Sequence, residues 1–311
     1  MHAISRRDTC KAIAAAVSSQ VTRTMTAASP SQGKQMQLHF SLASALYGTM
    51  PLEVVLPEVH RAGAEVIDIW SAPHGDQREQ IEKIGPNAFA ALLSKDEVEL
   101  GLFTCYPLGP FKLEDDMKLV QRLGGRMVLT GSGGPKDPAG ESAKKEIQVF
   151  LEKMKPHAVT AEDAGLTIAI ENHVGSLLSH PDSLRYFADF NRLPNLGVAF
   201  APHHLHDHVA QIPDLIEHLG KNLVFFYAQE YGKGFTKKLP KDEEMMQLPG
   251  YGGGLDYRPV LAALSRIHYR GWIEILMHPT PRGIPILPTA KEITAAVNKS
   301  RKYLESCLPA K

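Results

Sequence analysis

Short apolar runs alternate with longer segments of helical periodicity from residue 37 to the end of the chain. The runs are five to seven residues long and are rich in β-branched side chains, which is typical of parallel strands that are buried on both faces. The pattern predicts eight strands, at Leu38 to Ala43, Glu65 to Trp70, Val98 to Thr104, Arg126 to Thr130, Leu166 to Glu171, Leu196 to Ala201, Leu223 to Gln229 and Trp272 to Met277.

Between these runs, apolar residues recur at positions i, i+3, i+4 and i+7, which predicts amphipathic helices. The expected helices cover 52–62, 87–95, 114–123, 141–164, 181–190, 209–219, 257–267 and 289–304. Strands that alternate with helices favour a parallel sheet, and eight such units over about 270 residues fit a closed (β/α)8 barrel. No G-x-G-x-x-G follows the first strand, which argues against a doubly wound sheet. The predicted fold class is therefore α/β, a single-domain (β/α)8 TIM barrel over residues 37–311.

The first 36 residues differ from the rest in composition, because Ser, Thr, Ala and Gln dominate and cannot build a core. The segment Ser5 to Lys11, followed by apolar Ala12 to Val17, resembles a twin-arginine export signal, and Thr26 to Ala28 offers a small-residue cleavage site. The apolar stretch is short, and Arg23 lies close to the expected cut. The leader therefore predicts either export to the periplasm or a disordered extension of a cytoplasmic protein.

Charge and cysteine content narrow the range of partners. The 34 basic and 34 acidic side chains balance, so the chain lacks the basic excess that is typical of proteins binding nucleic acid or anionic membranes. No apolar run is long enough to span a bilayer as a helix. The three cysteines, Cys10, Cys105 and Cys307, form no C-x-x-C pair, which excludes a zinc ribbon or a disulfide framework. A small molecule is the expected partner.

The histidine content is high, at 14 of 311 residues, and six of these histidines lie between positions 173 and 208. In a (β/α)8 barrel the active site lies at the carboxyl ends of the strands, where several of these histidines fall. The period of two places Glu171 and His173 on one face of their strand, and likewise Glu274 and His278. Imidazole and carboxylate groups together suit Zn, Mn, Co or Fe.

Glu171 is the strongest ligand because an unpaired carboxylate at the end of an apolar strand is costly. We predict a divalent metal held by Glu171, His204 and His278, against the alternatives that His204 is a loop residue and His278 a turn residue beside two prolines. The neighbouring His203, His206 and His208 are expected to be loop or helix-start residues.

Other polar and aromatic side chains at the strand ends complete the predicted site. The expected catalytic residues are Glu171, His173 and Glu230. The expected substrate contacts are Asp68, Trp70, His74, Tyr106 and Arg282, for which ordinary packing at a strand end is the rival interpretation.

Several motifs in order along the chain resemble a known family. They are Gly63 followed by Asp68-Ile-Trp70, then Gly165 to His173, Leu196 to Leu205, Pro249 to Gly252 with Asp256, and Tyr269 to Trp272. Over about residues 37–305 the chain resembles the sugar phosphate isomerase/epimerase family of xylose-isomerase-like TIM barrels, and Met277 to Pro285 resembles an uncharacterised bacterial subgroup in particular.

The resemblance implies one divalent metal, Mn, Co, Zn or Mg, held by a Glu on strand five, an Asp on strand six, a His on strand seven and a Glu on strand eight. Glu171 matches the first of these. Ala201 stands where the D-x-x-H motif has its Asp, while His204 keeps the His. The segment from Tyr227 to Glu230 has no His, and strand eight offers Leu276, Met277 and His278 in place of Glu. The resemblance therefore implies a rebuilt metal site.

The predicted function is a metal-dependent sugar isomerase or epimerase. It would abstract a proton α to the carbonyl of an unphosphorylated or lightly modified keto-sugar. One alternative is a lyase that eliminates from a keto-sugar of the 3-keto-glycoside type, since only one family carboxylate remains. A second is a non-catalytic sugar-binding barrel. A DNA-repair endonuclease of the same superfamily is disfavoured by the zero net charge. A homo-oligomer is common for such barrels, but nothing in the sequence fixes the oligomeric state.

Overall fold

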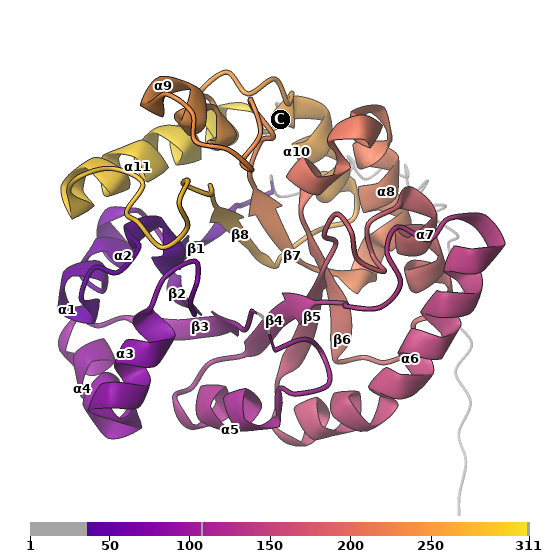
Figure 1. Cartoon of the computed structure of the whole chain (residues 1–311), viewed down its shortest axis with the longest axis horizontal. Coiled ribbons are helices and arrows are strands. Elements are labelled where there is room, and N and C mark those ends of the chain that lie inside the picture. The colour runs from indigo at the N-terminus through magenta and orange to yellow at the C-terminus, as the bar shows by residue number, and fades with distance from the viewer. Residues whose placement is uncertain (1–35, 107, 310–311) are drawn as a thin grey trace, which may run out of the picture. The chain divides into compact units, whose positions relative to one another are not determined.

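Eight parallel strands close into a barrel in sequence order in the computed structural model, which describes residues 36–106 and 108–309 (Figure 1). The strands are β1 His39–Ala43, β2 Val66–Trp70, β3 Glu99–Thr104, β4 Met127–Gly131, β5 Thr167–Glu171, β6 Leu196–Phe200, β7 Leu223–Ala228 and β8 Trp272–Ile275. Each lies within two residues of its predicted bounds. The barrel closes where β1 pairs with β8, with Ser41 opposite Glu274. The predicted TIM barrel is confirmed, whereas the predicted leader, apart from Met36, lies outside the described residues.

The helices surround the barrel (Figure 1). They are α1 Leu52–Val55, α2 Glu58–Arg61, α3 Gln77–Ile84, α4 Pro86–Lys95, α5 Glu114–Arg122, α6 Gly140–Asp163, α7 Pro181–Phe190, α8 Ile212–Leu219, α9 Lys241–Glu244, α10 Tyr257–Arg266 and α11 Ala290–Ser306, with short 3-10 helices η1 Ser44–Tyr47, η2 Pro202–Gln211, η3 Gly220–Asn222 and η4 Met245–Gln247. No helix within the described ranges is both long and apolar enough to cross a bilayer.

Two predicted helices differ from the observed ones. The segment 52–62 divides into α1 and α2 because Pro57 has no N–H to donate to the preceding turn. The segment predicted at 209–219 begins earlier, in the 3-10 helix η2, and becomes α-helical only at Ile212. Since η2 directly follows β6, its residues are held close to the barrel mouth.

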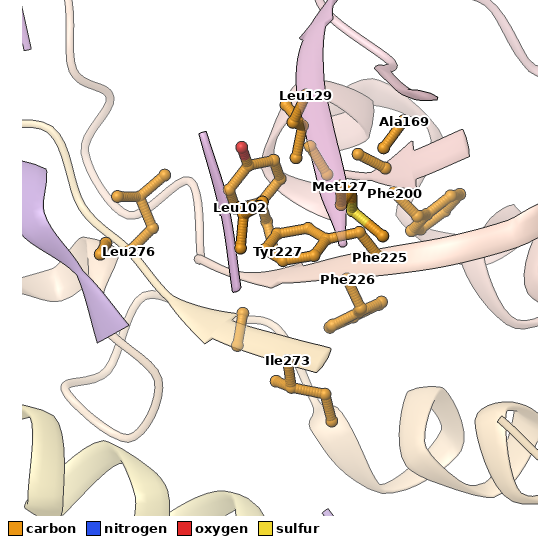
Figure 2. Close-up of a cluster of buried hydrophobic side chains, with 14 of the residues drawn as sticks. Leu102, Met127, Leu129, Ala169, Phe200, Phe225, Phe226, Tyr227, Ile273 and Leu276 are labelled. Carbon is orange, nitrogen blue, oxygen red and sulfur yellow. The ribbon is translucent and has the colours of Figure 1, made fainter. Parts of the chain in front are cut away.

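Alternate residues of each strand face the barrel interior, and the others pack under the helices. On the outer face, the rings of Phe200 and Phe226 stack across neighbouring strands with centroids 6.1 Å apart. Figure 2 shows Tyr227 and Leu102 among the buried side chains of the same cluster. Burying each aromatic ring stabilises the fold by roughly 1.5–3 kcal/mol relative to an exposed ring, so the strand ends form a fixed frame for the mouth.

Candidate active site

A carboxylate and two adjacent histidines meet where β5 and β6 end. Glu171 is the last residue of β5, and His203 and His204 lie in the first turn of η2. One ligand atom from each residue can be chosen so that all three lie within 4.8 Å of one another. Nε2 of His204 lies 3.4 Å from Oε1 of Glu171. We call Glu171, His203 and His204 the histidine cluster.

A side-chain clamp between β5 and η2 holds the histidine cluster together. The Asn172 amide donates to the carbonyl of Ala201 at 3.0 Å, and the Ala201 N–H donates to the Asn172 carbonyl oxygen at 2.6 Å. Pro202 then starts the turn with its fixed φ. Sequence reasoning gave Asn172 no role. Its signal was an amide side chain placed directly after the buried Glu171.

Both ring nitrogens of His203, and both of His204, make no hydrogen bond to any described residue, although both side chains are buried. A buried polar atom without a partner is costly. Burial lowers the pKa of His203 well below its usual range and also lowers that of His204, against the opposing pull of Glu171. Both rings are therefore neutral near pH 7, which is the form that binds a metal. The donor set fits a divalent ion that accepts imidazole and carboxylate ligands.

Glu171 is anionic in this setting. Burial raises its pKa, but the imidazole of His204 and the hydroxyl of Tyr106 favour the charged form, and the net effect lowers the pKa. The Tyr106 hydroxyl donates to Oε2 of Glu171 at 2.6 Å. Burial and the adjacent carboxylate raise the pKa of Tyr106 well above its usual range, so Tyr106 keeps its proton. The predicted contact residue Tyr106 therefore orients Glu171.

His173 stands beside the histidine cluster, with its ring centroid 4.0 Å from that of His204. Its Nδ1 lies 2.7 Å from the backbone carbonyl of Val174. Because a carbonyl oxygen only accepts, Nδ1 carries the proton of the neutral ring, and Nε2 keeps a free lone pair. This tautomer leaves Nε2 able to take up a proton.

Trp70, His74 and His278 form a second group of rings that meets the histidine cluster. The His74 ring centroid lies 5.2 Å from that of Trp70 and 5.1 Å from that of His278. His278 lies 6.2 Å from His203 between ring centroids, outside the group of three ligand atoms. Burial, followed by the charge of Arg282, lowers the pKa of His74 to about 4. The assignment of His278 as a ligand stays a prediction, while the structure brings His203 to the metal-binding group instead.

Glu230 lies in different surroundings. Its carboxylate oxygens accept the N–H groups of Gly250 and Leu255, each at 3.2 Å. Burial raises its pKa to about 7, although these backbone N–H groups oppose the shift. No hydrogen bond or ion pair within the described residues joins Glu230 to Glu171 or to the histidines. Its geometry is that of an anchor for the loop at 249–255.

Asp68 lies one layer deeper than Trp70 on the same face of β2. It is fully buried, and its Oδ2 accepts a hydrogen bond from the Thr104 hydroxyl at 2.6 Å. Glu274, whose Oε2 accepts from the Ser41 hydroxyl at 3.1 Å, is its acidic neighbour. Burial raises the pKa of both carboxyls. Oδ1 of Asp68 and Oε1 of Glu274 are buried without a hydrogen-bond partner in the described chain. The assignment of Asp68 as a substrate contact stays a prediction.

Comparison with known proteins assigns the chain to a family. The family model described as xylose isomerase-like TIM barrel matches residues 56–306. The chain belongs to this family. No curated protein matches the chain.

Many solved structures share this family fold. The IOLI protein with a zinc atom is 16% identical, with a TM-score of 0.68 over 88% of this chain and 100% of that one. D-psicose 3-epimerase with D-tagatose from Clostridium cellulolyticum H10 is 14% identical, with a TM-score of 0.66 over 88% and 100%. A probable 3-DHS dehydratase, AsbF, from Bacillus anthracis is 12% identical, with a TM-score of 0.63 over 85% and 99%. At these identities the likeness lies in the fold.

Proposed function

We propose that this member of the xylose isomerase-like family is a metal-dependent sugar isomerase or epimerase. It moves a proton α to the carbonyl of an unphosphorylated or lightly modified keto-sugar. The observation that carries the proposal is the buried histidine cluster, in which His203 has no hydrogen-bond partner in the described chain and His204 has the anionic Glu171 beside its Nε2. Such a donor set is costly unless it binds something.

Glu171, His203 and His204 would hold the metal. A divalent ion bound there would polarise the substrate carbonyl and stabilise the negative charge that develops on its oxygen. The Tyr106 hydroxyl keeps one Glu171 oxygen in place, and the Asn172 clamp fixes the two histidines. These second contacts orient the ligands before substrate arrives.

His173 is the proposed base. Its Nε2 takes the proton from the carbon next to the carbonyl, and the electron pair of that C–H bond forms the enediolate. Isomerisation results when His173 returns the proton to the neighbouring carbon and the substrate's own hydroxyl proton passes to the former carbonyl oxygen. Return to the opposite face needs a second donor, for which His278 is the candidate, because its ring centroid lies 6.2 Å from that of His203. Trp70 offers an apolar surface for the C–H face of a sugar ring.

Solved neighbours support the class of reaction. They include an IOLI protein with bound zinc and two 3-epimerases of one ketose, which is named D-allulose in one and D-psicose in the other. A probable dehydratase has the same fold, so elimination remains the alternative reaction. Elimination begins with the same proton abstraction and differs only in expelling a group from the β carbon.

Metal analysis combined with deuterium exchange tests the proposal. Purified protein is assayed for bound metal and then incubated with D-fructose, D-tagatose, D-allulose and a 3-keto-glycoside in D2O, with NMR detection. We expect about one metal per chain and deuterium entering a carbon beside the carbonyl, with loss of exchange after chelation. Loss of the glycosidic group from the 3-keto-glycoside would establish the lyase instead. Full metal without exchange into any sugar would contradict the proposal and favour a binding barrel.

A further inference from the structure

Arg282, in the segment after β8, carries a charge without an internal partner. Its guanidinium makes no hydrogen bond or ion pair with any described residue, and its Nη1 is buried without a partner. Its Cζ lies 5.7 Å from the centroid of the Phe235 ring. That ring lies within 5.6 to 5.8 Å of His203, His204 and His278. Arg282 therefore stands at the edge of the site, held against an aromatic face.

The acidic groups near Arg282 are already engaged. Glu171 and Glu244 are the carboxylates whose charge reaches it, but neither forms an ion pair with it in the described chain. Glu171 is bound by Tyr106 and His204, as described above. Glu244 pairs with Lys241 and accepts the Thr280 N–H at 2.8 Å. Burial lowers the pKa of Arg282 only to about 10, so it stays cationic at neutral pH. A partly buried cation of this kind fits an anion brought from outside.

The neighbouring charges indicate which anion. The positive charge of Arg282 reaches the rings of His74, His203 and His204. A single planar guanidinium matches a carboxylate through two parallel hydrogen bonds. A phosphate dianion would more often meet several cations or a helix N-terminus. The Nδ1 atom of His74, which is buried without a partner, offers a further polar contact.

We propose that the substrate is a sugar acid, a keto-sugar bearing a carboxylate that binds Arg282. This inference rests on the proposed function, since it names the substrate class of the same site. The carboxylate would anchor one end of the sugar at Arg282 while the carbonyl end faces the histidine cluster. The uronic acid of a ketose thus fits better than the neutral ketose.

Calorimetric binding of matched sugars to the full chain tests this assignment. D-fructose is compared with D-fructuronate, and D-tagatose with D-tagaturonate, because each pair differs only in CH2OH against COO−. We expect the acids to bind about 10- to 100-fold more tightly, the range for a charged hydrogen-bonded contact. R282Q removes most of this preference, R282K keeps part of it, and R266Q, at an exposed arginine paired with Glu217, keeps all of it. Thermal melts confirm that each variant is folded.

Three results of the binding comparison would overturn the assignment. They are equal binding of acid and neutral sugar by the native protein, an acid preference that survives R282Q, and tighter binding of D-fructose 6-phosphate than of D-fructuronate. Chelation shows whether Arg282 or the metal binds the carboxylate. The acid preference persists without metal if Arg282 binds it. Loss of the preference on chelation would mean that the metal binds it, and would also overturn the assignment. Deuterium exchange separates this inference from the function. Exchange into the sugar acids that is as fast in R282Q as in the native protein, with binding as tight, leaves the function intact and removes the inference, whereas Arg282-dependent binding of the acids without exchange into any sugar does the reverse.

Discussion

The ends of β5 and β7 carry the same residue type in contrasting surroundings. Glu171 and Glu230 are equally hidden, with 4% and 2% of their surfaces exposed. Glu171 meets an imidazole and a phenol, which lower its pKa in spite of burial. Glu230 meets only backbone N–H groups, and burial raises its pKa to about 7. A buried glutamate at a strand end is therefore not a catalytic group by position alone.

The partners of each glutamate decide what it can do. The contacts of Glu230 are complete within the chain, since the loop at 249–255 wraps its carboxylate. The contacts of Glu171 lead to His204 and on to His203, and neither nitrogen of His203 has a hydrogen-bond partner in the described chain. An incomplete set of buried polar atoms points to a ligand, whereas a satisfied set points to structure. Point variants at these residues test this contrast.

The isosteric pair E171Q and E230Q tests the contrast directly. E171Q removes the only charged ligand, so we expect metal affinity to fall by roughly 100-fold or more and exchange to be lost. E230Q keeps the metal and costs only stability, because its new NH2 group faces backbone N–H donors. Metal content by mass spectrometry and urea unfolding measure the two effects. Metal loss in E230Q to the same extent would remove the distinction.

Single alanine variants of the histidines define the ligand set. H203A and H204A should each weaken metal binding by roughly 100-fold, because each removes a donor from the cluster of three. H278A should weaken it by less than about 10-fold, since a second contact costs less than a ligand. Metal titration with a competing chelator measures all three. The reverse order, with H278A severe and H203A mild, would restore the set of Glu171, His204 and His278.

H173A separates proton transfer from metal binding. Loss of the Nε2 base should slow deuterium exchange by about 100-fold or more while metal content and KM stay unchanged. H218A, at an exposed histidine paired with Asp189, serves as the matched control. An exchange rate in H173A equal to that of the native protein would assign the base elsewhere.

The effect expected to be smallest on metal binding and exchange concerns the stability contributed by the buried carboxyls Asp68 and Glu274. Their pKa values are raised, so between about pH 4 and pH 7 the unfolded chain releases protons that the folded chain retains. The native protein should therefore lose stability as pH rises through this range, by up to about 1.4 kcal/mol per pH unit for each such group. D68N should flatten this slope in urea unfolding of metal-free protein. Parallel curves for both proteins would mean that Asp68 ionises normally.

The fold could be predicted almost entirely from the sequence because the strands of a parallel barrel are apolar on both faces. Each apolar run therefore marks a strand with little ambiguity. The helix α3 was missed because only Gln77 and Ile81 are buried along its length, too thin a stripe for periodicity to detect. The split at Pro57 was missed because the apolar pattern continues across it.

The site was predicted in part. The residues that were predicted have local sequence signals, whereas those that were missed depend on contacts between residues far apart in the sequence. Glu171 stood out through its place at the end of an apolar strand, which is a local signal. The inward position of His203 depends on the clamp between Asn172 and Ala201, which lie 29 residues apart. The anchoring of Glu230 depends on N–H groups 20 and 25 residues further along the chain. Neither contact leaves a local pattern in the sequence.

Anomalous diffraction from crystals grown with zinc or manganese tests the central claim most directly. The account predicts one strong metal peak at the mouth of the barrel, about 2.0–2.2 Å from a Glu171 oxygen and from one ring nitrogen each of His203 and His204. A peak between Asp68 and Glu274, or at Glu230, would contradict the account. So would the absence of any peak at the histidine cluster in crystals whose protein contains one metal per chain.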